Sequence, residues 1–118
     1  MTISPQSSAA LDRLITLTQD LLAEMASAEN LYPSAPGSGW SGAMETVQRH
    51  LAFAVEGRAA DDAPLALRGA NLLTTANKGV GDLETSTADR PISEKAFAVT
   101  RAAIDAAKHL RSDAGLGF

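Results

Sequence analysis

The side chains with the most potential for chemistry are the two histidines, His50 and His109. Asp105 precedes His109 by four residues and Asp113 follows it by four, so these three side chains would share one face of a helix. His50 has no Asp or Glu three or four residues away. Metal sites in helical bundles normally combine several such ligands, as in paired Glu-x-x-His motifs, and this chain has no such motif. We therefore expect no metal site and no cofactor.

Nucleophilic catalysis and phosphate binding have no signature in the sequence either. A Ser-His-Asp triad is assembled in space and so stays open, but no strand-turn-helix nucleophile elbow is present. Gly79 and Gly81 do not follow a predicted strand, which argues against a phosphate-binding loop. The Asp61-Asp62 pair is more typical of a helix cap than of a cation site. We expect a non-enzymatic protein, with a small enzyme or metal-binding bundle that brings both histidines together as the alternative.

The composition indicates a small acidic domain built from helices. Hydrophobic residues make up 45% of the 118 residues but aromatic residues only 4%, so Ala, Leu and Val have to fill the core. The net charge of -4 argues against nucleic-acid binding and against a polybasic membrane contact, since both need a basic face. No apolar run approaches the ~20 residues of a membrane span, and the first residues do not resemble a secretory signal peptide. The absence of cysteine excludes a disulfide framework.

Four segments with helical periodicity predict an all-α fold, an antiparallel helical hairpin extended to a four-helix bundle, in a single domain over residues 1–118. The first helix is expected over about 5–30, with Ser4 as the N-cap and Pro5 at the first helical position. The second helix is expected over about 41–60. The apolar faces of these helices predict that they pack as a hairpin.

The rest of the chain divides at two prolines. Asp61-Asp62-Ala63-Pro64 either separates the second helix from a third or kinks one continuous helix. The third segment covers about 64–88, completes a hairpin-like part over 5–88, and is weakened by Gly79-Val80-Gly81. An additional C-terminal helix is expected over 92–114. Its predicted apolar stripe comprises Phe97, Thr100, Ile104, Ala107 and Leu110, flanked by Ala96, Val99 and Ala103.

Apolar residues three and four apart on the first two helices form a continuous stripe. Such a stripe is either the core face of a bundle within one chain or a seam for a second chain. The seam would bind a helical protein partner or a second copy of the chain as a homodimer. The predicted partner interface comprises Leu11, Leu14, Ile15, Leu21, Leu22, Met25, Val47, Leu51 and Val55.

The chain bends between these two helices in a run over 32–42 that is dense in Pro, Gly and Ser. This run contains the only tryptophan of the chain, in the tripeptide Trp40-Ser41-Gly42. Ser38 or Ser41 can cap the following helix by accepting a backbone N–H. We expect Trp40 to cover the end of the bundle and Gly42 to allow a tight backbone.

The tripeptide, its place about forty residues into the chain and the helix on each side resemble the WXG-motif family. These are small helical-hairpin proteins handled by bacterial type VII secretion systems. The resemblance implies that Trp40 and Gly42 form the turn and that two hairpins pair into a four-helix bundle. It also implies a substrate, or a targeting partner for a larger secreted toxin, that is secreted by a route independent of a signal peptide.

One export pattern of that family is absent and another is partly present. The Tyr-x-x-x-acid signal is absent, because Tyr32 lies in the bend and Pro36 follows it by four residues. A His-x-x-x-Asp pattern followed by an apolar residue is matched by His109, Asp113 and Leu116. The additional C-terminal helix is not required by the two-helix family, so the alternative is a cytoplasmic four-helix adaptor or regulatory module.

Overall fold

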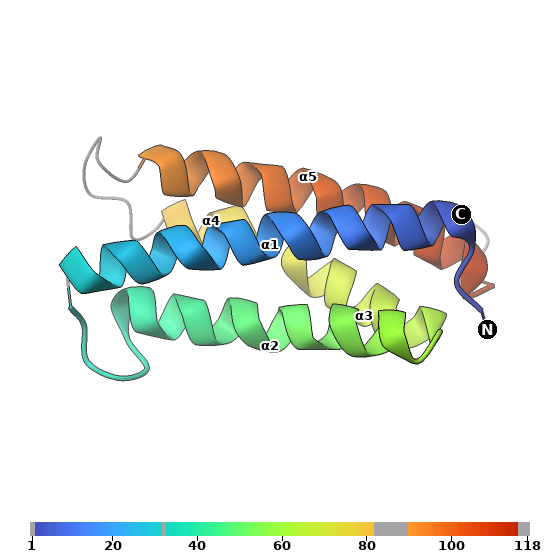
Figure 1. Cartoon of the computed structure of the whole chain (residues 1–118), viewed down its shortest axis with the longest axis horizontal. Helices are drawn as coiled ribbons and strands as arrows, with labels where there is room; N and C mark the ends of the chain where they lie inside the picture. The colour runs from blue at the N-terminus through green and yellow to red at the C-terminus, as the bar shows by residue number, and fades with distance from the viewer. Residues whose placement is uncertain (1, 32, 82–89, 116–118) are drawn as a thin grey trace.

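Helices dominate the computed structural model, which describes residues 2–31, 33–81 and 90–115 (Figure 1). The helices in these ranges are α1 (Pro5–Leu31), α2 (Gly39–Ala59), α3 (Ala63–Leu73), α4 (Ala76–Gly81) and α5 (Arg90–Asp113). α1 and α3 each pack against both α2 and α5, and α4 continues the column of α3 against α5. Successive columns run in opposite directions (Figure 1). The prediction of an all-α bundle of four antiparallel columns is confirmed.

α1 begins and ends close to where its sequence predicts. Ser4 is the N-cap, because its Oγ accepts a hydrogen bond of 3.2 Å from the Ser7 N–H. Pro5 occupies the first helical position, where no backbone donor is needed. The predicted apolar face is turned inward. Its fully buried members are Leu11, Leu14, Thr18, Leu21 and Met25.

The Asp61-Asp62 segment reverses the chain between α2 and α3. Asp61 has a φ of +54°, a left-handed conformation that Asp tolerates better than most residues. Asp62 then caps α3 by accepting a hydrogen bond of 3.1 Å from the Leu65 N–H, and Pro64 lies in the first turn of that helix. The helix is therefore not continuous across Pro64.

The antiparallel α2 and α3 approach so closely that their backbones touch. A Cβ at Gly57 would collide with the backbone of Ala66, and a Cβ at Gly69 would collide with the backbone of Ala54. Glycine is therefore required at both positions by close approach. Small residues at helix contacts let the backbones approach closely, so a chain with few aromatic residues can still form a tightly packed bundle.

The third helical segment is interrupted earlier than its glycines predict. Instead of one helix over 64–88, α3 ends at Leu73 and α4 begins at Ala76, while residues 82–88 lie outside the described ranges. The hydroxyls of Thr74 and Thr75 donate to backbone carbonyls three residues back, at 2.6 Å and 3.2 Å. These local bonds offer the backbone an alternative to the helical ladder. The helix therefore breaks at Thr74 and Thr75 and not at Gly79-Val80-Gly81.

α5 is rotated relative to the stripe predicted from its largest apolar residues. Phe97 and Ile104 are 51% and 55% exposed, so the prediction that they face the core is wrong. Thr100 is half-buried, and only the last two members of the predicted stripe are buried. The buried face is instead made mostly of alanine: Ile92, Ala96, Val99, Ala102, Ala103, Ala106, Ala107 and Leu110. Small side chains let α5 approach α1, α3 and α4 together, which larger ones would prevent.

Candidate functional site

The bend between α1 and α2 is built around the Trp40-Ser41-Gly42 tripeptide. Trp40 is the second residue of α2 and is buried in the hydrophobic core. A Cβ at Gly42 would lie 2.6 Å from the carbonyl oxygen of Gly37, so only glycine fits this turn. Gly37 itself has a φ of +80°. The tripeptide therefore closes the left-hand end of the hairpin in the view of Figure 1.

Ser34 supplies the hydrogen bonds that hold this bend. Its hydroxyl donates to Glu29 at 2.8 Å and accepts from the Ser41 N–H at 3.3 Å. Ser38 stands at the N-cap of α2 but makes no capping bond there, since its hydroxyl bonds to the Ala35 carbonyl. The sequence had suggested Ser38 or Ser41 as the capping side chain. The Ser34 hydroxyl caps α2 instead, because it accepts from the N–H of Ser41, seven residues further along the chain.

Most of the predicted partner interface faces the interior of its own chain. Its two half-buried members are Ile15 and Leu22, and Val55 is 41% exposed. The six buried members are Leu11, Leu14, Leu21, Met25, Val47 and Leu51. A partner that paired through these six would first have to displace α5 or separate α1 from α2. Pairing through this stripe stays a prediction, and only three of its residues reach the surface.

The predicted export signal lies where the end of α5 meets the beginning of α1. Asp113 accepts a hydrogen bond of 3.0 Å from the Ser4 N–H, and His109 Nε2 lies 3.7 Å from an Asp105 carboxylate oxygen. Partial burial would raise the pKa of Asp113, but hydrogen bonds from Ser7 and Ser4 outweigh it and lower the pKa from its ordinary value. Asp113 therefore ties the two ends of the chain together. Leu116 lies outside the described residues.

A cavity of about 560 Å³ opens beside the bend, between α2 and the junction of α3 with α4. Burial, reinforced by the charge of Arg49, lowers the pKa of His50 on its wall and favours the neutral imidazole. The described part of the wall carries no Asp or Glu to pair with this histidine as a general acid and base. Its described lining includes Gly39, Ala43, Val47, His50, Leu72 and Lys78. The size suits a small molecule, but the wall offers no reacting pair.

The outward face of α5 carries a second candidate site, which we name the outer stripe. Its residues follow one another at spacings of four and three, so they share one face of the helix. The five members are Phe97, Arg101, Ile104, Lys108 and Arg111, and all are exposed. None of the three cations has an ion-pair partner within the part of the chain that the structure describes. The outer stripe is an apolar and basic surface on an acidic protein.

The outer stripe was not expected from the sequence, because the predicted stripe of this helix placed Phe97 and Ile104 in the core. The signal was present, since Arg101 and Lys108 lie on the same helical face as Phe97 and Ile104. A core face does not interleave unpaired cations with its largest residues. The alanines on the opposite face satisfy the helical period equally well and carry no charge.

Wider surveys of the chain add few constraints. Comparisons with protein-family models, with curated proteins and with solved structures find no match. Among the described residues, no helix combines the length and apolar character needed to cross a bilayer. No group of three metal-ligating side chains gathers within those residues either.

Proposed function

We propose that this protein is a non-enzymatic helical module that acts by binding another protein, as an adaptor or regulatory partner. The carrying observation is that the apolar stripes of all four columns meet in one core within a single chain. Leu14 of α1, Leu73 of α3 and Leu110 of α5 are each completely buried there. A module with a complete core keeps its fold when unbound and offers its outer surface to a partner.

The proposal is tested first by the oligomeric mass and the unfolding of the purified chain. Light scattering at several concentrations is expected to give the mass of one chain, and chemical denaturation is expected to give one cooperative transition. Leu31→Ala, a change at an exposed residue of α1, serves as the control and should alter neither result. An obligate dimer would contradict the proposal, because the core would then belong to two chains.

We infer as a second candidate a role in type VII secretion, as a substrate or as a targeting partner for a larger secreted toxin. The bend supports this candidate, because Trp40 is buried at the junction of two antiparallel helices and Gly42 packs against the Gly37 carbonyl. The resemblance implies that Trp40 and Gly42 form the turn, and both residues lie in the first turn of α2, next to the bend. The break between α2 and α3 and the presence of α5 separate this chain from a plain two-helix hairpin.

Export is tested by expressing the full chain in a bacterial host with and without an active type VII secretion system. The protein is expected in the medium only when the system is active, with a cytosolic marker protein retained in the cells. His109→Ala is expected to reduce the exported fraction severalfold if the His-x-x-x-Asp pattern is read. Retention of the unaltered protein in both hosts would remove this candidate and leave the adaptor role.

A further inference from the structure

We propose that the outer stripe of α5 is a docking surface for an acidic amphipathic helix of a partner protein. This inference rests on the proposed protein-binding function and deepens it by naming the chemistry of the partner. The starting observation is the exposure of two large apolar side chains, Phe97 at 51% and Ile104 at 55%, one heptad apart on one helix. Each leaves apolar area in water that a partner can cover.

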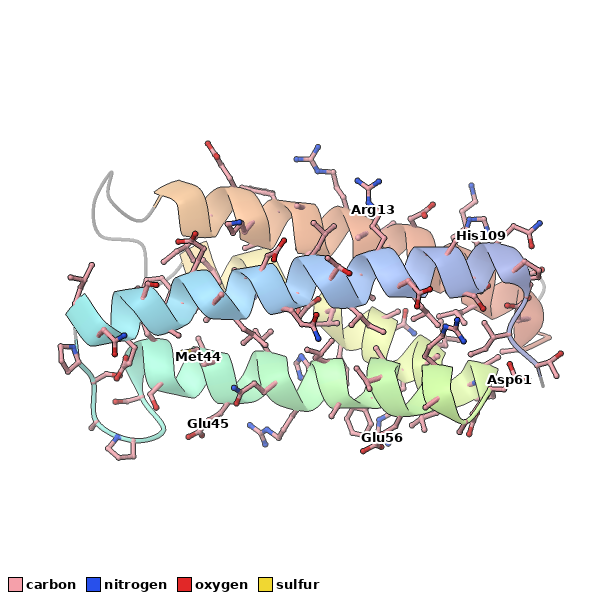
Figure 2. All side chains as sticks on the ribbon, in the orientation of Figure 1. Arg13, Met44, Glu45, Glu56, Asp61 and His109 are labelled. Atoms are coloured by element: carbon pink, nitrogen blue, oxygen red, sulfur yellow. The ribbon has the colours of Figure 1, made fainter. Side chains whose placement is uncertain are left out.

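The charges on the outer stripe indicate which kind of surface covers it. Arg101 and Lys108 interleave with the two apolar residues, and Arg111 extends the row. In the view of Figure 2, Arg13 of α1 also projects on the side where α5 lies. The outer stripe itself therefore carries three exposed cations on a chain whose net charge is -4. Acidic side chains flanking an apolar seam would complement this arrangement.

The shape of the outer stripe fits a helix. From Phe97 to Arg111 the stripe covers fifteen residues of α5, a length of about 21 Å from the first to the last at the ordinary helical rise. The alternating spacing of four and three is that of a helix-helix seam. A single helix lying along four turns buries less area than a stable dimer interface, so the contact belongs to the weak, reversible class.

Two other occupants fit these observations less well. A second copy of the chain would place Arg101, Lys108 and Arg111 against the same cations, and like charges across an interface are repulsive. An anionic membrane would attract the outer stripe but repel the remainder of a chain with a net charge of -4. Glu94 and Asp105, both exposed on α5 beside the stripe, would repel an anionic membrane and an acidic helix alike, so the charge preference comes from the three cations of the stripe itself.

The test uses the full chain and a fluorescein-labelled synthetic peptide of four heptads. The peptide has leucine at the first and fourth positions of each heptad and glutamate at the positions that flank this seam. The matched probe replaces every glutamate by lysine. Fluorescence anisotropy is expected to show micromolar binding of the glutamate peptide, at least tenfold weaker binding of the lysine peptide, and loss of affinity as salt is raised.

Two variants assign the binding to the outer stripe. The double change Phe97→Ala with Ile104→Ala, and separately Arg101→Glu with Lys108→Glu, are each expected to weaken binding at least tenfold. Leu31→Ala, at an exposed apolar residue of α1, is the control and should leave the affinity unchanged. Circular dichroism confirms that each variant is folded before its affinity is compared.

Four results would overturn the inference. These are equal binding of the two peptides, unchanged binding by either double variant, binding to phosphatidylserine vesicles without binding to the glutamate peptide, and dimerisation that Phe97→Ala abolishes. If the chain is monomeric and unfolds cooperatively but does not bind the glutamate peptide, this inference fails while the proposed function stands. An obligate dimer held through the core would remove the proposed function itself.

Discussion

α1 and α5 lie side by side along the bundle and have opposite ways of filling the space between helices (Figure 1). α1 buries its large apolar side chains, including Leu14, Leu21 and Met25 at zero exposure. α5 buries mostly alanines, including Ala96, Ala103 and Ala106, and turns Phe97 and Ile104 outward. The difference shows that the size of apolar residues identifies the core face of a helix only where its neighbours leave room.

The neighbours of the two helices explain this difference. α1 makes its main contacts with α2 and α5, whereas α5 contacts α1, α3 and α4. Three neighbours around one helix leave little space between the backbones, and alanine fills little space. α1 therefore supplies most of the volume of the core, while α5 fits against it and keeps a free outer stripe.

The largest loss of stability is expected from Leu14→Ala in α1. The side chain is completely buried, so the change leaves a cavity and should lower the free energy of unfolding by about 2–5 kcal/mol. Chemical denaturation at constant temperature measures the loss. Leu31→Ala, at a residue that is 73% exposed, is the matched control and should change stability by less than about 0.5 kcal/mol. Equal losses in both variants would contradict the assignment of α1 as the main source of core volume.

The converse change, Ala103→Leu in α5, should also destabilise the bundle. Ala103 has no exposed surface, and a larger side chain would force α5 away from its neighbours at a cost of about 1–3 kcal/mol. Ile104→Leu, one residue further along and exposed, is the control that conserves size. If Ala103→Leu stabilised the protein, α5 would have unused space beneath it, and the argument from close packing would fail.

The sequence predicted the class of fold and most helix limits because these depend on local signals. Ser4 and Pro5 start α1, and Asp62 caps α3, through bonds that need no distant residue. The rotation of α5 could not be read in this way, because it depends on how closely three other helices approach. The bonds from Ser34 into the bend were missed for a related reason, since they join residues brought together only by folding.

A smaller effect is expected where Asp113 joins the end of α5 to the beginning of α1. Hydrogen bonds from Ser7 and Ser4 hold the pKa of Asp113 below its ordinary value, so this contact stabilises the fold at pH values above the pKa of the unfolded chain. The stabilisation is lost as the pH falls through the lowered pKa of the folded state. Because Asp113 is only partly buried and water screens the contact, Asp113→Asn should cost well under ~1 kcal/mol at neutral pH.

The pH dependence makes this small effect measurable. Unfolding free energies taken from pH 6 down to pH 2 are expected to fall less steeply in Asp113→Asn than in the unaltered chain. Asp20→Asn, at an exposed aspartate of α1, is the matched control and should follow the unaltered protein. Parallel curves for all three proteins would show that the Ser4 contact does not contribute to stability.

The smallest effect on stability is expected from the double change Phe97→Ala with Ile104→Ala. Both side chains lie half or more in water, and alanine has the higher helix propensity, so the free energy of unfolding should stay within about 0.5 kcal/mol of the unaltered protein. A loss of more than about 2 kcal/mol would mean that these residues support the core and that the outer stripe is not available to a partner. A negligible loss in stability combined with lost peptide binding would separate the two faces of α5, one for folding and one for recognition.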